Sequence, residues 1–241
     1  MIGAGRGRLR DYAAELFTIF AGIVLALLAG STWDYSSDRR REHEYLAGIR
    51  AELDASAQEL ANDQDVRSGD LELLASLVDA ARRRAALPDD SVPRAINALL
   101  NFRFFSPTRA VLDDLIDSGN LRLVRSDSVR FALQGYRQQM DQLAVVEKRE
   151  RDFIAETVEP YVATHVRIVD ILPLQSYDER ITSPAIDASA FHAMVRNDAF
   201  ASLVFMRWER SSTAHRFGLG MALTIDQLIA VLDEALGRPT S

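Results

Sequence analysis

The sequence predicts an all-α protein in which an N-terminal transmembrane helix continues into a long stalk helix, packed with antiparallel long helices and short capping helices. Three observations predict this fold. The segment "AELFTIFAGIVLALLAGSTW" is apolar along its length, apolar residues further on recur at steps of three and four, and helix-capping residues precede several of these runs. The predicted organisation is a short tail at 1–12, a transmembrane helix at 13–33, a stalk helix at 34–87 and a helical bundle packing on the stalk at 88–241.

The composition is that of a folded protein and narrows the possible partners. The 241 residues are 48% hydrophobic and 26% charged. Residues 1–33 carry a net charge of +1, so residues 34–241 carry −8, with acids and arginines interleaved. This acidic balance disfavours a nucleic-acid partner, because a protein that binds nucleic acid needs a basic face to neutralise the phosphates. The absence of cysteine excludes disulfides and cysteine-based metal sites.

The predicted transmembrane helix has the length and the flanks of a bilayer span. From Leu16 to Thr32 there are 17 consecutive uncharged residues. Residues 13–33 would form a helix of ~31 Å, which matches the hydrocarbon core of a bilayer. Tyr12 at one end and Trp33 and Tyr35 at the other are the aromatic residues that favour the membrane boundary, and we interpret them as interfacial anchors. The lipid bilayer is therefore the first predicted partner.

The alternative to an anchor is a cleaved export signal. "RGRLR" resembles a basic n-region, and Ala29-Gly30-Ser31 has the form of a cleavage site. Against this alternative, Glu15 stands where the apolar region of a signal should begin, and the helical pattern continues without a break into the stalk. Three arginines lie on each side of the span, so the charge rule for orientation is nearly balanced. The N-terminal amine favours an N-terminus inside the cell.

One face of the predicted span carries small and polar residues. Gly22, Ala26 and Gly30 repeat at intervals of four, and the residues on the same face are Glu15, Thr18 and Ala29. Faces of small residues allow helix backbones to approach closely in lipid, so we expect a homo-oligomer formed through this helix. The alternative is that glycine and alanine are merely common in membrane helices. Glu15 either reaches the headgroups and an arginine or forms a ring of carboxyl groups in an oligomer.

The stalk carries a pattern that is typical of a coiled coil. Its seam, in steps of three and four, consists of Leu46, Ile49, Leu53, Ser56 and Leu60. Polar Asp63 and Arg67 interrupt this seam before Leu71, Leu74 and Val78 resume it. We expect the seam to continue the contact between copies that begins in the membrane, and the helix to end before the loop at Pro88.

Several short and two long helices should follow the stalk. We expect helices at 93–101, at 107–118 with a left-handed stop at Gly119, and from Asp127, capped by Ser126, to the region before Pro160. An irregular stretch spans 171–184. Beyond it, Ser189 opens a short helix and Asp198 a longer one, which "FGLGMAL" is expected to kink or interrupt before the terminal helix "TIDQLIAVLDEALGR".

Two segments of the chain resemble a known family. "FAGIVLALLAGSTWDYSSDRRREHEYLAGIRAELD" and "LIDSGNLRLVRSDSVRFALQGY", in this order and at this separation, resemble an uncharacterised family of bacterial single-pass membrane proteins that is defined only as a domain of unknown function. The resemblance covers most of the chain. It implies an anchored helical domain, and it implies no activity and no site residues. With the orientation that the N-terminal amine favours, we expect the protein in the bacterial inner membrane with a cytoplasmic N-terminus and a periplasmic helical domain.

No motif points to catalysis, a cofactor or a metal. The four histidines are widely spaced, and there is no glycine-rich phosphate loop, serine nucleophile elbow or paired-acid motif. We therefore expect no enzyme, no cofactor and no metal site. In "FRFF", Phe102, Phe104 and Phe105 cannot all face one side of a helix. We favour a loop folded over the core, and contact with another chain or a ligand is the alternative.

The function that fits best is a membrane-anchored, self-associating helical scaffold or interaction protein whose bundle binds an unknown protein partner. The alternative is a homo-oligomeric channel or ion-pathway component in which Glu15 lines the opening. A ligand sensor is a third possibility, although only about ten residues precede the span.

Overall fold

Every regular element that the structure describes is a helix, which confirms the all-α prediction. The computed structural model describes the backbone of residues 5–168, 171 and 187–238, and side chains from residue 35 onward in these ranges. The α-helices are α1 (Gly5–Arg83), α2 (Val92–Leu100), α3 (Ala110–Asp117), α4 (Asp127–Phe153), α5 (Glu159–His165), α6 (Ser189–Val195) and α7 (Asp198–Leu236). Two 3-10 helices, η1 (Asp89–Ser91) and η2 (Asn120–Leu123), and a π-helical turn, η3 (Ile154–Val158), complete the set.

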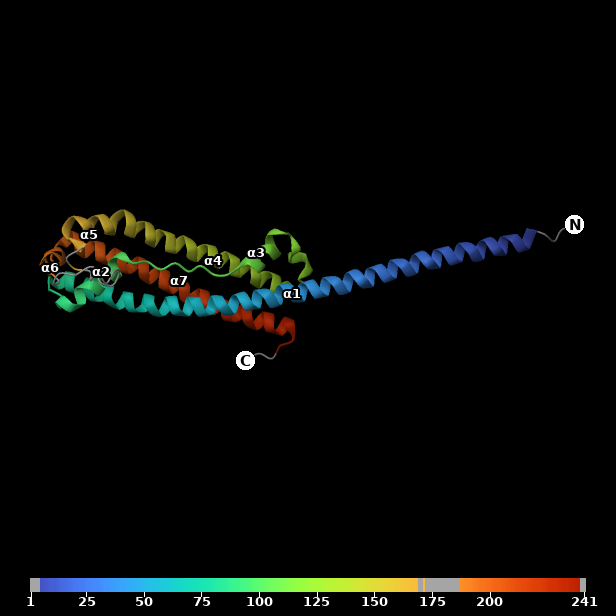
Figure 1. Ribbon diagram of the computed structural model, residues 1–241, viewed down its shortest axis with the longest axis horizontal. Coiled ribbons are helices and arrows are strands. Elements are labelled where there is room, and N and C mark those ends of the chain that lie inside the picture. The colour runs from blue at the N-terminus through green and yellow to red at the C-terminus, as the bar shows by residue number, and fades with distance from the viewer. Residues whose placement is uncertain (1–4, 169–170, 172–186, 239–241) are drawn as a thin grey trace, which may run out of the picture.

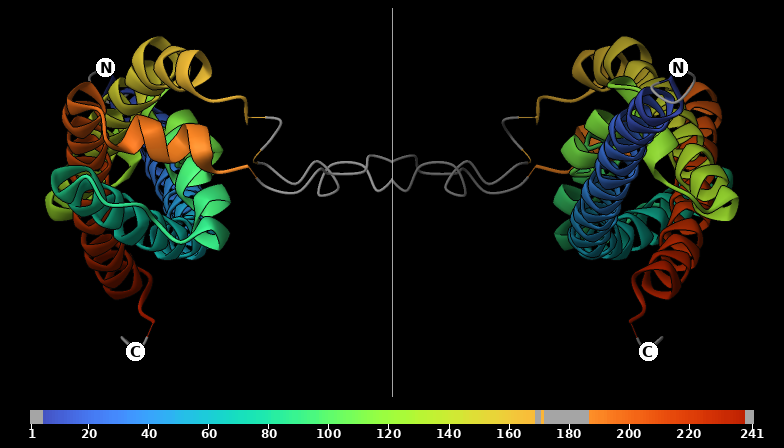
Figure 2. Two further views of the ribbon diagram at one scale, coloured as in Figure 1. Left: turned by 90° about the vertical axis from the view of Figure 1, so that its left-hand side faces the viewer. Right: turned by 90° about the vertical axis from the view of Figure 1, so that its right-hand side faces the viewer.

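Three long helices form the body of the molecule. α7 packs lengthwise against both α1 and α4 and runs antiparallel to them, while α2, α5 and α6 gather at the distal end and α3 lies where α1 enters the bundle (Figure 1). Figure 2 shows the short helices across the distal end of the bundle. Long helices that cross at small angles with short helices at one end agree with the coarse arrangement expected from the sequence.

Within the residues whose side chains are described, no helix combines the length and the apolar character that a bilayer span requires. The predicted span at 13–33 lies outside those residues, within the N-terminal part of α1. Its membrane assignment therefore stays a prediction.

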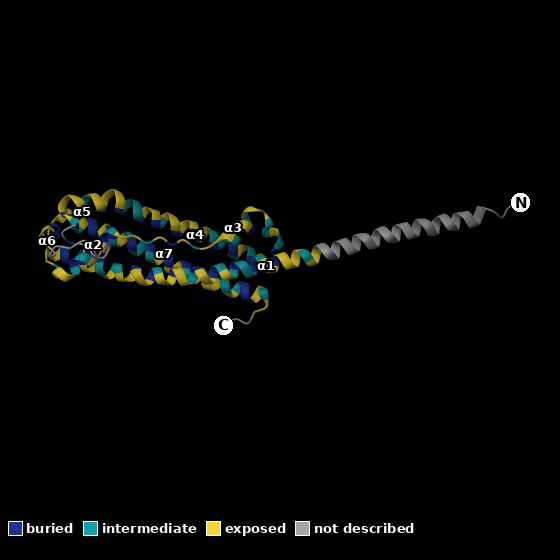
Figure 3. Cartoon of the chain, viewed as in Figure 1, coloured by how far each residue is buried: buried dark blue, intermediate teal, exposed yellow. Residues whose placement is uncertain are grey.

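The apolar seam of α1 faces the same chain and not a second copy. Leu46, Ile49, Leu53 and Leu60 are at most 3% exposed and share a cluster with Met221, Ile225, Leu228 and Leu232 of α7. Ser56 is fully buried as well. The prediction that this seam continues the contact between copies is wrong, because α7 already covers it. The buried stripes of the long helices face one another in Figure 3.

The core consists of two apolar clusters along the bundle. A distal cluster joins the end of α1 to α2, α6 and the start of α7, around Leu77, Ile96, Phe191 and Phe200. A basal cluster joins the middle of α1 to α3, the first half of α4 and the end of α7. Burial of these side chains is the main stabilising contribution to the bundle.

Four fully buried charged side chains lie between the three long helices. Arg67 of α1 donates to Glu150 of α4 at 2.7 Å and to Glu147 of α4 at 3.2 Å. Arg207 of α7 donates to the second carboxylate oxygen of Glu150 at 2.7 Å. All four are at most 2% exposed. Arg67, which interrupts the apolar seam in the sequence, is thus paired inside the core, where an unpaired charge would be costly.

The same network fixes the extended segment 101–109 that joins α2 to α3, hereafter called the strap. Arg207 donates to three carbonyls at the end of α2 and the start of the strap, those of Ala98, Leu99 and Asn101, at 3.2, 3.1 and 2.7 Å. Arg67 donates to the Arg103 carbonyl at 3.1 Å, and Glu147 accepts from the Phe105 amide at 3.0 Å. The arginines therefore satisfy carbonyls that the end of α2 leaves without helical partners.

Most predicted helix ends agree with the structure. The Ser126 hydroxyl accepts from the Val129 amide at 3.4 Å and caps α4, and Gly119 has a left-handed φ of 74° after α3. The predicted end before Pro160 differs, because the π-helical turn η3 carries the chain on into α5, where Pro160 lies in the first turn.

The expectation that "FGLGMAL" interrupts the C-terminal helix is wrong, since α7 runs through it from Asp198 to Leu236. Gly218 is buried against α1, and a Cβ placed there would overlap the side-chain amide of Gln64 and lie 2.7 Å from its Cδ. A Cβ on Gly220 would meet nothing within 4 Å. Gly218 thus allows the close approach of α1 and α7.

We expect Gly218→Ala to destabilise the protein by about 1 kcal/mol, because the buried Gln64 side chain must move to admit the methyl group. Gly220→Ala is the matched control and should be neutral or stabilising by up to about 1 kcal/mol, since alanine favours a helix. Chemical denaturation measures both. In a Gln64→Ala background the penalty of Gly218→Ala should disappear, and an unchanged penalty there would contradict this packing.

The buried carboxyl of Glu147 predicts a pH dependence of stability. Desolvation raises its pKa from the ordinary value of 4.5 to about 7. Because the folded state then binds the proton more tightly than the unfolded state, the stability contributed by this group is full below about pH 4.5 and is lost as the pH rises through about 7.

The free energy of unfolding of the wild type should therefore fall relative to that of Glu147→Gln as the pH is raised across this window. Denaturant titrations of both proteins at each pH measure the difference, and other titrating groups cancel in it. A difference that does not change with pH would show that Glu147 ionises normally in the fold.

Candidate functional site

The base of the bundle, where α1 meets α3, η2, the start of α4 and the end of α7, contains a cavity lined by polar and charged side chains. Two carboxylates of α1 hold the surrounding elements. Glu52 accepts from the amides of Val111 at 2.8 Å and Leu112 at 3.3 Å, at the N-terminus of α3, where a negative charge is favoured. Glu42 accepts from the Arg125 amide at 2.8 Å, just before α4 begins.

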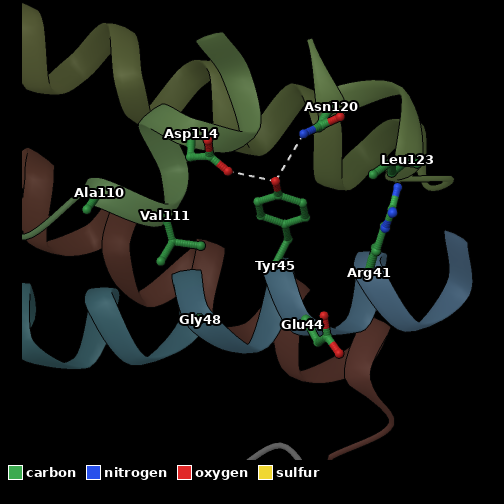
Figure 4. Close-up of a pocket in the computed structure, with 9 residues that line it drawn as sticks. All are labelled: Arg41, Glu44, Tyr45, Gly48, Ala110, Val111, Asp114, Asn120 and Leu123. Atoms are coloured by element: carbon green, nitrogen blue, oxygen red, sulfur yellow. Dashed lines mark hydrogen bonds between the residues drawn. The ribbon is translucent and has the colours of Figure 1, made fainter. Parts of the chain in front are cut away.

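Tyr45 of α1 lies at the centre of this region (Figure 4). Its hydroxyl donates to Asp114 Oδ2 of α3 at 2.6 Å and accepts from Asn120 Nδ2 of η2 at 3.0 Å. The hydrogen bond to the Asp114 carboxylate raises the pKa of the tyrosine. Tyr45 therefore stays protonated at neutral pH and acts here as a hydrogen-bond donor, not as a base.

The cavity around Tyr45 has a volume of about 520 Å³ and is open to solvent. Its lining is Arg41, Glu44, Tyr45, Gly48, Ala110, Val111, Asp114, Asn120 and Leu123. A Cβ on Gly48 would lie 3.1 Å from Val111 Cγ1, so α3 rests close on α1 at this point. The cavity therefore contains one guanidinium, two carboxylates and a side-chain amide above an apolar floor, so it presents both positive and negative charge.

The chemistry of the cavity is that of binding. A small polar molecule could accept from Arg41 and donate to Glu44 or Asp114, while its apolar part lies on Ala110 and Val111. No nucleophile with an activating base lies among its lining residues. Among the described residues, no three histidine, aspartate or glutamate side chains are grouped as metal ligands.

Tyr35 is the one residue of the predicted membrane-helix set whose side chain is described. Its hydroxyl accepts from Arg125 Nη1 at 2.9 Å, and the Arg125 guanidinium lies 4.3 Å from the centre of its ring. Tyr35 thus ties α1 to the base of the bundle. The side chains of the other predicted site residues lie outside the described residues: Tyr12, Glu15, Thr18, Gly22, Ala26, Ala29, Gly30 and Trp33.

The cavity was not predicted from the sequence. Asp114 and Asn120 lie 69 and 75 positions after Tyr45, so no local spacing connects the three residues. The available signal was the turn at Gly119, which places Asn120 beside the end of α3. Tyr45 fitted the helical pattern of the predicted stalk, and no motif around it indicated a functional role.

The structure divides the three phenylalanines of "FRFF". Phe105 is buried at 5%, as the core interpretation requires, whereas Phe102 and Phe104 are 44% and 52% exposed. The strap is extended, so consecutive side chains point to opposite sides. The core interpretation therefore holds for Phe105, and contact of Phe102 and Phe104 with another chain or a ligand stays a prediction.

No family model, curated protein or solved structure matches this chain. The resemblance to bacterial single-pass membrane proteins accordingly stays a prediction from the sequence.

We expect Tyr45→Phe to loosen α3 from α1, because the variant removes the hydroxyl that joins Asp114 and Asn120 but keeps the ring. Hydrogen exchange of the α3 amides should accelerate by about tenfold, as the two hydrogen bonds lost at this open site contribute little net stability. Tyr35→Phe is the matched control and should leave exchange in α3 unchanged. Equal exchange in wild type and Tyr45→Phe would contradict the role of this hydroxyl.

Proposed function

We propose that this protein is a membrane-anchored, self-associating helical scaffold that holds an interaction domain close to the membrane surface. The observation that carries the proposal is the continuity of α1 from Gly5 to Arg83. This single helix contains both the predicted span at 13–33 and the residues from Leu46 to Ala81 around which the core is built. An anchor and a bundle that share one helix need no flexible linker between them.

The contacts at the base support a short distance between the predicted bilayer and the bundle. Tyr35 and Glu42 both bind Arg125 of the bundle, at 2.9 Å through the tyrosine hydroxyl and at 2.8 Å through the Arg125 amide. Trp33 and Tyr35 are two positions apart, or ~3 Å of helix. The basal cavity would then open near the headgroups, in the outer part of the interface. The proposed location is the bacterial inner membrane, with the N-terminus cytoplasmic and the bundle periplasmic.

Self-association in this proposal is assigned to the predicted span alone. The seam of the stalk is buried within its own chain, so it offers no contact to a second copy. The face of Gly22, Ala26 and Gly30 is the part of the chain that has the small side chains required for close helix pairing in lipid. The channel alternative depends on Glu15, and no described residue adds support to it.

We expect the full-length protein in nanodiscs to have the mass of a defined oligomer, and Gly22→Ile/Gly30→Ile to reduce it to a monomer, because the larger side chains separate the paired backbones. Native mass spectrometry or light scattering measures the mass. The matched control, Val24→Ile/Leu27→Ile, enlarges or reshapes the opposite face and should keep the oligomer.

Two results would contradict the proposal. Recovery of the protein in the soluble fraction without detergent would contradict the proposed membrane anchor. If the wild type and both variants were monomers, the membrane anchor would remain possible and the proposed self-association would be contradicted.

A further inference from the structure

Two exposed phenylalanines stand on the outer side of the strap. Phe102 and Phe104 alternate with the partly buried Arg103 and the buried Phe105, as side chains do along an extended chain. Exposed aromatic side chains that lie this close together are unusual on a soluble surface. Aromatic residues are also enriched among those that dominate binding between proteins.

The strap is held in place before any partner binds. Its backbone is bound by Arg207 at Asn101, by Arg67 at Arg103 and by Glu147 at Phe105, all three side chains being at most 2% exposed. The Ser106 amide also faces Glu59 of α1 at 3.4 Å. A surface that is already ordered loses little conformational entropy on binding, which favours affinity.

A hollow of about 520 Å³ lies between α1 and α2, the helix that leads into the strap. Val66 and Leu73 contribute its apolar part, and Asp65, Asp70 and Glu72 contribute carboxylates. Asp70 connects the hollow to the strap, because its carboxylate interacts electrostatically with Arg103. Burial raises the pKa of Asp70, whereas the guanidiniums of Arg103, Arg207 and Arg67 act to lower it, so cations of the chain itself already face this carboxylate.

The negative charge of this surface indicates which class of partner would bind it. Glu59, Asp65 and Glu72 are exposed along α1, whereas the basic residues of this surface are Arg94 in the hollow and the partly buried Arg103 of the strap. The local excess of carboxylates repels anionic lipid headgroups and nucleic-acid phosphates and attracts a basic polypeptide.

We propose that the strap and the hollow form one docking surface for a basic, amphipathic segment of a partner protein. An apolar side chain of the segment packs on Phe102 and Phe104, and an arginine or lysine enters the hollow toward the exposed carboxylates of Asp65 and Glu72. This inference rests on the proposed function only in requiring that the scaffold has a protein partner, and it is independent of self-association.

The test uses the full-length protein in nanodiscs of zwitterionic lipid and three fluorescent synthetic peptides, with empty nanodiscs as the blank. One peptide alternates arginine and leucine, the second alternates glutamate and leucine, and the third alternates arginine and serine. Fluorescence anisotropy measures binding. The arginine–leucine peptide should bind most tightly, and its affinity should fall as salt is added.

Phe102→Ala/Phe104→Ala should weaken this binding by about tenfold or more, because it removes the aromatic contacts without changing a charge. The matched control is Phe131→Ala, which removes a phenylalanine that is 73% exposed on α4 and should leave binding unchanged. Asp65→Asn/Glu72→Gln should weaken binding and reduce its salt dependence. Circular dichroism verifies that each variant is folded.

Three results would overturn the proposal: no binding of the arginine–leucine peptide, equal binding by Phe102→Ala/Phe104→Ala, or equal binding of the glutamate–leucine peptide. The mass of the same nanodisc samples separates this outcome from a failure of the proposed function. A monomer that still binds the peptide through the strap would contradict self-association and keep the docking surface.

Discussion

The pairing of Arg67 and Arg207 with Glu147 and Glu150 is the constraint on which the rest of the structure depends. α7 packs against both α1 and α4, and the four charges join all three helices at one level of the bundle, between the two apolar clusters. Burying these charges is costly, and removing Arg67 would deprive Glu147 of its guanidinium, as removing Glu150 would deprive Arg207 of its carboxylate. The network therefore fixes the register of three helices more strictly than apolar packing alone requires.

The sequence predicted local features well because their causes are local. Ser126 and Gly119 act at helix ends through a side-chain cap and a left-handed backbone, both of which depend on neighbouring residues only. The seam of α1 was correctly identified as buried. Its partner was not, because periodicity indicates that a face is covered and does not say whether the same chain covers it.

The features that escaped prediction depend on contacts between distant residues. Arg67 was interpreted as an interruption because its partners lie 80 and 83 positions away. Gly218 was interpreted as a weak point in a helix, whereas its missing side chain accommodates Gln64 of another helix. The basal cavity likewise combines residues from α1, α3 and η2 that no motif connects. What the sequence lacked in each case was the arrangement of the helices, not the residue types.

The continuity of α1 also determines how the two ends of the molecule are oriented. In a helix, each residue turns the chain by about 100° and advances it by about 1.5 Å, so residues 34–41 set the angle between the face of Gly22 and the basal cavity. The number of residues in this stretch therefore fixes the rotation of the bundle about the axis of α1, relative to the N-terminal part of the helix. A change in the length of this stretch would turn the cavity and the strap to a different side of any assembly that the N-terminal part of α1 forms.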